Sequence, residues 1–189
     1  MNFPSGSVAD NLMLMRGVWH DRVELFEPDG RVREYDEQGG TPGASPYENV
    51  VYIDFDGVEM RQTNVTFRGR PLHVRSFVSR MVDGILRFEK LGPNDPGHVG
   101  VAAGEGVLIF APIVIDDSWM RYSEPDYIRV IGETRTRNTM LYRDGKLVRT
   151  MNVAGKLLTR DTSKRVDLDP RGPIGEVHET PGATQVFKS

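Results

Sequence analysis

In the stretch GVWHDRVELF, every second residue from Trp19 to Leu25 is apolar except for one carboxylate, Asp21. This alternating set consists of Trp19, Asp21, Val23 and Leu25. Alternate residues of a strand point to the same side, so the pattern places Asp21 among apolar neighbours. A buried carboxylate has a raised pKa and can act as a general acid or base. The interpretation that we favour is structural: Asp21 pairs with an inward arginine such as Arg149, or lies near an open rim.

Further polar side chains lie on the two runs that flank Asp144-Gly145. If this dipeptide forms a tight turn, Tyr142 pairs with Leu147 and Met140 pairs with Arg149. The more apolar face of this hairpin is expected to point inward. That face carries Thr136, Asn138, Met140, Tyr142, Leu147, Arg149, Met151 and Val153.

The inward face of this hairpin supplies most of the candidate site. Arg149, Asn138 and Tyr142 could hold a carboxylate or phenolic oxygen of a mostly apolar ligand. The candidate catalytic residues are Asp21 and Tyr142, and the candidate ligand-binding residues are Trp19, Asn138, Met140, Arg149 and Met151. The alternative is a polar network that satisfies itself and sets the strand register.

Several other kinds of site are not expected. His20, His73, His98 and His178 show no metal-ligand spacing, so we expect no metal site. The chain has no cysteine, which excludes disulfides, thiolate metal sites and a cysteine nucleophile. The sequence contains no glycine-rich phosphate loop, nucleophile elbow or dinucleotide fingerprint, and no cofactor is expected.

The charge balance gives no sign of a nucleic-acid or membrane partner. The chain has 24 basic and 27 acidic residues and a net charge of -3. Arg129, Arg135, Arg137 and Arg143 fall on one side of an expected strand. A solvated barrel exterior explains this stripe better than RNA binding does. The N-terminal segment has no basic region and only a short apolar run, so we expect a cytoplasmic location. The sequence leaves open whether the protein forms a homodimer.

Asp-Gly dipeptides mark the hairpins that must position these residues. They stand at 29-30, 56-57, 83-84 and 144-145, and Asp-Gly accepts the positive φ angles of tight turns. A short helix is expected at 7-16, with Ser7 or Asp10 as its N-cap. Loops rich in glycine and proline are expected at 38-47 and 92-104. The expected strands are 17-27, 31-37, 48-55, 58-67, 72-82, 85-91, 105-115, 118-124, 127-143 and 146-159.

A meander of this kind predicts one all-β domain. The chain of 189 residues fits a single domain of ordinary size. An antiparallel meander has two unpaired edges, and closure into a barrel removes both. We therefore expect an antiparallel up-and-down barrel of about 8–10 strands with a short N-terminal helix. Residues 1-160 would form the barrel, and residues 161-189 would form a C-terminal tail or strap.

A Gly-x-Trp on the first strand, a meander of hairpins and an arginine on a late strand occur together in this chain. The combination resembles the lipocalin or calycin superfamily of ligand-binding barrels. The resemblance implies that Trp19 lies at the closed end of the barrel, with Arg149 or Arg160 packed across its indole. Secreted members of this superfamily usually carry disulfides. This chain has no cysteine, so it resembles an intracellular, bacterial-type member more closely. Haem-binding relatives have further glycines where this chain has His20-Asp21-Arg22, which argues against haem.

Two functions are compatible with these residues. The protein could bind a small, largely apolar ligand that bears a carboxylate or phenolic group inside the barrel. It could instead be a cofactor-free lyase, isomerase or cyclase acting on such a molecule, with Asp21 or a tyrosine moving a proton. A filled barrel with a structural or interaction role is a third hypothesis. Likeness of fold does not decide among them.

Overall fold

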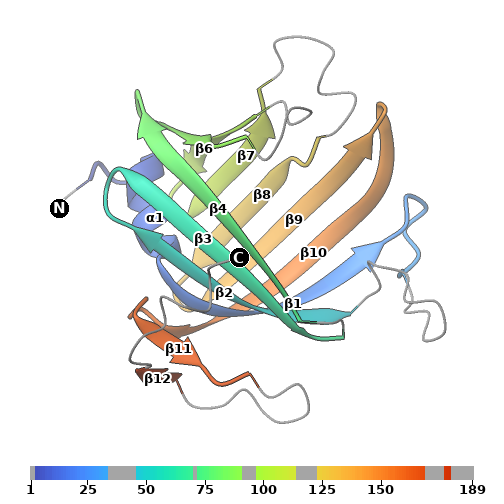
Figure 1. Cartoon of the computed structure of the whole chain (residues 1–189). Helices are drawn as coiled ribbons and strands as arrows, with labels where there is room; N and C mark the ends of the chain where they lie inside the picture. Colours follow the sequence, from blue (N-terminus) through green and yellow to red (C-terminus); the bar gives the residue numbers. More distant parts are fainter. Residues whose placement is uncertain are drawn as a thin grey trace.

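The structure, a computed structural model, describes residues 3–33, 46–69, 72–90, 97–113, 123–168 and 177–179. In these ranges, helix α1 (Val8–Met15) lies at one end of a closed barrel (Figure 1). The barrel strands are β1 (Gly17–Phe26), β2 (Tyr47–Phe55), β3 (Glu59–Arg68), β4 (His73–Val82), β5 (Ile85–Phe88), β6 (His98–Gly104), β7 (Val107–Pro112), β8 (Asp126–Ile131), β9 (Thr134–Arg143) and β10 (Lys146–Thr159).

The barrel is an up-and-down meander. Each strand pairs antiparallel with the next strand along the chain, and β1 also pairs with β10, which closes the sheet. Closure gives every barrel strand a paired neighbour on both sides. The prediction of an all-β, antiparallel up-and-down barrel with a short N-terminal helix is confirmed.

Two of the Asp-Gly dipeptides form the tight turns that the sequence predicts. Asp83 and Gly84 have φ angles of 53° and 79°, and Asp144 and Gly145 have φ angles of 49° and 69°. Consecutive positive φ angles define a turn whose twist matches that of a two-residue hairpin. These turns join β4 to β5 and β9 to β10.

The expected single strand at 127-143 is wrong, because the chain reverses in its middle. Residues 126–131 form β8 and residues 134–143 form β9, which pair with each other. The turn passes through Gly132, whose φ is 57°. Glycine adopts this left-handed conformation at little cost, which permits a two-residue turn between the strands.

The expected loop at 92-104 is wrong over its second half. Residues 98–104 form β6, which pairs with β7. The sequence signal for this strand is weak because HVGVAAG is rich in small residues. At Gly100 an added Cβ would lie 2.8 Å from the ring of Phe110, so the glycine makes room for that aromatic side chain. The expected strands 31-37 and 118-124 fall mostly outside the described residues.

Helix α1 is fixed across the end of the barrel. Ser7 is its N-cap and accepts a hydrogen bond from the backbone N–H of Asp10 (3.2 Å). The buried side chain of Asn11 donates through Nδ2 to the carbonyl oxygens of Gly104 (2.8 Å) and Val107 (3.0 Å). Its Oδ1 accepts from the N–H of Gly106 (2.8 Å). The helix is therefore tied to the β6–β7 hairpin by three hydrogen bonds from one side chain.

A short strand after the barrel covers part of its outer surface. β11 (Lys164–Val166) pairs with β12 (Val177–Glu179). Val166 packs with Val18, Val50 and Phe67 in a buried cluster separate from the barrel interior. Its N–H donates to the hydroxyl of Tyr52 (3.3 Å). The role of residues 161-189 as a tail or strap stays a prediction.

Candidate functional site

The closed end of the barrel is built around Trp19. Its side chain is fully buried, and Nε1 donates to the carbonyl oxygen of Met15 at the end of α1 (2.8 Å). The guanidinium carbon of Arg160 lies 5.6 Å from the centroid of the Trp19 ring, and that of Arg135 lies 5.1 Å from it. Cation–π contacts of this length stabilise a buried indole.

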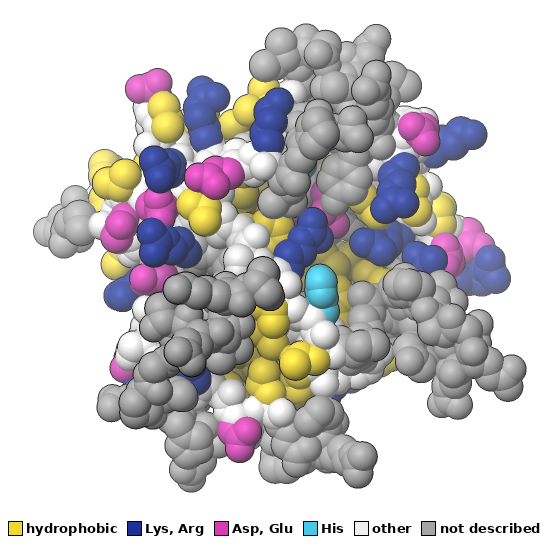
Figure 2. All heavy atoms as spheres, in the orientation of Figure 1, with side chains coloured by type: hydrophobic (Ala, Val, Ile, Leu, Met, Phe, Trp, Pro, Cys, Tyr) yellow, Lys and Arg dark blue, Asp and Glu magenta, His cyan; other side chains and the backbone are white. Residues whose placement is uncertain are grey.

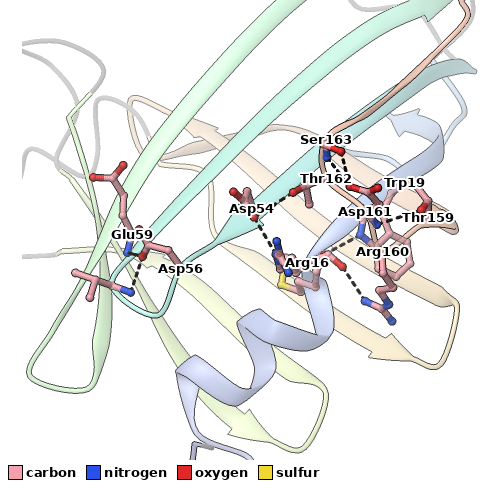
Figure 3. Close-up of polar contacts among 12 residues, drawn as sticks. Arg16, Trp19, Asp54, Asp56, Glu59, Thr159, Arg160, Asp161, Thr162 and Ser163 are labelled. Atoms are coloured by element: carbon pink, nitrogen blue, oxygen red, sulfur yellow. Dashed lines mark hydrogen bonds and ion pairs between the residues drawn. The ribbon is translucent and has the colours of Figure 1, made fainter. Parts of the chain in front are cut away.

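Arg160 joins three parts of the chain at this end. It donates to the carbonyl oxygens of Leu14 (2.5 Å), Arg16 (2.8 Å) and Gly132 (3.1 Å). Figure 3 shows Arg160 beside Trp19, where α1 leads into β1. The arginine that the resemblance places across the tryptophan is therefore Arg160 and not Arg149.

Asp21 is buried and pairs with Arg135. The Arg135 Nε donates to Oδ1 (3.1 Å) and its Nη2 donates to Oδ2 (2.5 Å). Both side chains are 6% exposed. The strand register explains the contact, because Asp21 on β1 and Arg135 on β9 both lie opposite Gly155 on β10. The structural interpretation of Asp21 as an ion-pair partner holds, although the partner is not Arg149.

Gly155 makes the Asp21–Arg135 pair sterically feasible. A Cβ at this position would lie 2.5 Å from Oδ1 of Asp21 and 2.6 Å from Cγ of Arg135. Both side chains thus meet over the bare backbone of β10. Any larger residue at 155 would push one of the two charged groups out of place.

Gly155→Ala is expected to lower the free energy of unfolding by about 1–3 kcal/mol, because the new methyl group overpacks the ion pair. Urea denaturation followed by circular dichroism measures this loss. Ala154→Val is the matched control, because it adds volume at an exposed neighbour and should change stability by no more than about 0.5 kcal/mol. Equal stability of the two variants would contradict the role given to Gly155.

A second carboxylate–arginine pair lies beside the first. Arg137 donates through Nε to Oδ1 of Asp126 (2.9 Å) and through Nη2 to Oδ2 (2.7 Å). The hydroxyl of Thr139 also donates to Oδ1 of Asp126. Burial raises the pKa of Asp126, and the contacts from Arg137 and Thr139 oppose that rise only in part. Burial disfavours the charged form of Arg137, but Asp126 outweighs it and raises the pKa of Arg137.

A cavity of about 90 Å³ opens inside the barrel beside these pairs. Its apolar wall comes from α1, β4, β5, β7 and β8 and consists of Met15, Phe77, Phe88, Phe110 and Ile128. Its polar wall consists of Gln62, Glu89, His98, Glu124, Asp126, Arg135 and Arg137. Aromatic and aliphatic side chains that meet convergent polar groups in one concave space are features of small-molecule sites.

Comparisons with known proteins establish the fold alone. No protein-family model and no curated protein matches the sequence. A DUF3598 family protein of unknown function from Nostoc punctiforme has a TM-score of 0.57 and 13% identity over 77% of this chain. The S-type phycobiliprotein lyase CPES from Guillardia theta has a TM-score of 0.57 and 11% identity over 80% of this chain and 92% of its own. This chain spans 48% of the DUF3598 protein. The closed barrel is consistent with a calycin-like fold.

The inward face predicted for β9 is wrong. Asn138 donates to Asn152 at an exposed position, Met140 is 44% exposed, and the Tyr142 hydroxyl contacts the Met140 sulfur. These three residues point outward. The buried residues of β9 are Arg135, Thr139 and Leu141, on the opposite face.

A β-bulge in β10 explains why the predicted inward face of this hairpin is split. Its β10 residues after the bulge face inward, whereas its β9 residues point outward. Next to the turn the predicted pairing holds, with Tyr142 opposite Leu147. The register then shifts at Val148, so that Arg149 lies opposite Leu141 and not Met140. The extra residue turns Arg149 and Met151 to the inner face. Met151 packs there beside the cluster of Val23, Leu25 and Val153.

None of the predicted site residues is part of the cavity lining. Trp19 and Asp21 adjoin it, because both contact Arg135, which does line it. Their roles, and those of Arg149 and Met151, stay predictions.

The sequence reasoning missed Asp126, Arg135 and Arg137. It placed the two arginines in an exterior stripe, which is wrong, because the turn at Gly132 reverses the alternation between β8 and β9. Arg129 and Arg143 of that stripe are exposed. The missed signal was Gly132-Glu133 between two β-prone runs, which marks a hairpin without an Asp-Gly pair.

Two further observations concern other kinds of site. Over the described ranges, no three His, Asp or Glu side chains gather closely enough to hold a metal ion. The helix that the structure describes falls short of the length and apolar character that a membrane span requires. Figure 2 shows Lys and Arg side chains interspersed with Asp and Glu on the face it presents.

Proposed function

We propose that this protein binds a small, largely apolar molecule inside the barrel, with a carboxylate or phenolic group directed at the polar wall. The observation that supports the proposal is the cavity itself. Its lining brings the rings of Phe77, Phe88 and Phe110 together with Asp126 and its arginine partner. Asp126 on β8 pairs with Phe110 on β7, so the carboxylate lies next to one of the rings. The rings supply burial area, and the polar wall orients one group of the ligand.

The size of the cavity limits the ligand. A volume of 90 Å³ is room for about six to nine water molecules, at about 10–15 Å³ for each. A single aromatic ring is enough to fill this volume, so the rest of a larger ligand would extend through the open side of the cavity. Two rings of the wall, Phe88 and Phe110, meet edge to face with centroids 4.8 Å apart, and a planar ligand could pack against both.

The second candidate is a cofactor-free lyase, isomerase or cyclase working in the same cavity. Two observations favour it: burial raises the pKa of Asp126, as a general acid requires, and one structural neighbour is a phycobiliprotein lyase. Turnover of a bound molecule would separate this function from binding alone. A cytoplasmic location, the absence of a nucleic-acid partner and a homodimer stay predictions.

Filling the cavity is expected to abolish most of the binding. Ile128 is 4% exposed and lines the cavity, so Ile128→Phe should weaken binding of the neutral apolar dye N-phenyl-1-naphthylamine by at least about tenfold. Fluorescence titration measures the affinity, and circular dichroism checks the fold.

The same strand offers a matched control. Ile131 is 57% exposed at the outer end of β8, so Ile131→Phe adds the same group outside the cavity. Its affinity for the dye should equal that of the wild type. Equal binding by the two variants, or no binding by the wild type, would rule out this cavity as the site.

A further inference from the structure

Both arginines that line the cavity already hold a carboxylate of the protein. Arg135 donates two hydrogen bonds to the carboxylate of Asp21, and Arg137 donates two to the carboxylate of Asp126. Two-pronged contacts of this kind are the strongest that a guanidinium makes with a carboxylate. A ligand carboxylate that took either place would leave a protein carboxylate buried without its cation, which is strongly unfavourable.

The charges around the cavity also oppose an anionic ligand. The described lining contains the basic residues Arg135 and Arg137 and the acidic residues Glu89 and Asp126. Arg135 is in addition matched by Asp21, which lies just outside the lining. A further negative charge would enter a site whose two described arginines are each already matched by a carboxylate of the protein, and where water screens poorly.

Asp126 keeps room for one more hydrogen-bond donor. An ionised carboxylate offers about four acceptor positions. Within the part of the chain that the structure describes, Oδ1 of Asp126 accepts from Arg137 and from Thr139, and Oδ2 accepts from Arg137 alone. Asp126 is 8% exposed and lines the cavity. A position on Oδ2 is therefore left for a donor inside the cavity.

From this geometry we infer that the cavity selects ligands through an uncharged hydrogen-bond donor of the phenolic type, accepted by Asp126, and discriminates against carboxylates. The inference rests on the proposed binding function and narrows it to one of the two ligand classes. The ring of such a ligand packs against Phe77, Phe88 and Phe110, and its hydroxyl donates to Asp126. A neutral donor satisfies the carboxylate without adding charge.

Three probes of one ring system test the selectivity of the wild-type protein. The affinities of 2-naphthol, 2-methoxynaphthalene and 2-naphthoate are measured at neutral pH by displacement of N-phenyl-1-naphthylamine. We expect 2-naphthol to bind at least about tenfold more tightly than the methyl ether, because only the hydroxyl can donate. The carboxylate should bind more weakly than the ether.

The possible results separate the two proposals. Binding of all three probes with 2-naphthoate tightest, or equal affinity for 2-naphthol and its ether, would overturn the inference and leave the binding function standing. Failure of the dye and of every probe to bind would overturn the binding function itself.

Asp126→Asn tests the residue that the inference names. The preference for 2-naphthol over its ether should fall to about threefold or less. Affinity for 2-naphthoate should rise, because Arg137 loses its counter-ion. The matched control is Asp54→Asn at the closed end, where Asp54 is exposed and pairs with Arg16. If Asp126→Asn does not fold, the wild-type probe series still decides the inference.

Discussion

Arg135→Met is expected to lower the free energy of unfolding by about 3–5 kcal/mol, because it leaves the Asp21 carboxylate buried without its cation. The pair is bidentate, and both side chains are only 6% exposed. The loss also removes the cation–π contact of Arg135 with Trp19. Equilibrium unfolding in urea, monitored by circular dichroism, measures the change.

Two further variants identify the cause of that loss. Asp21→Asn combined with Arg135→Met should recover most of the stability, because no charge is then left unpaired. Arg16→Met removes a surface pair whose arginine is 41% exposed, and it should cost no more than about 1 kcal/mol. If Arg135→Met costs no more than Arg16→Met, the buried pair does not support the barrel as we describe.

Trp19→Ala is expected to lower the free energy of unfolding by about 3–5 kcal/mol, because it leaves a cavity where a fully buried indole stood. The indole is fully buried, and its N–H donates a hydrogen bond to the carbonyl oxygen of Met15. Arg135 and Arg160 lose their shared aromatic partner at the same time. Thermal and urea unfolding of the variant both report the loss.

Tyr127→Ala is the control for the aromatic substitution. Tyr127 lies on β8 and is 43% exposed, so truncation there leaves no buried cavity and should cost no more than about 1 kcal/mol. A cost for Trp19→Ala that matches the cost for Tyr127→Ala would show that the closed end does not depend on the indole.

The barrel and the inward side of β1 were predictable because they depend on local patterns. Asp-Gly turns and alternating apolar residues specify hairpins from their own backbone preferences. The alternation of Trp19, Asp21, Val23 and Leu25 placed Asp21 inside, where the structure finds it. Gly-x-Trp also pointed to an arginine across the indole, and Arg160 occupies that place.

The composition of the site was not predictable from those patterns. Strand alternation has a period of two, so one extra residue moves every following side chain to the other face. The turn at Gly132 makes such a change before β9 and directs Arg135 and Arg137 inward and Asn138 and Met140 outward. The bulge at Val148 makes another and turns Arg149 and Met151 inward. Neither irregularity has a strong signal in the chain.

The sequence by itself therefore determined a closed antiparallel barrel, with a carboxylate and a tryptophan on the inner face of its first strand. Only the tertiary structure decided which arginine meets that carboxylate. Asp21 and Arg135 are 114 residues apart in the chain, and they meet because β10 lies between their strands and presents Gly155 there. Strand order and register, which depend on closure of the whole sheet, set such contacts between distant residues.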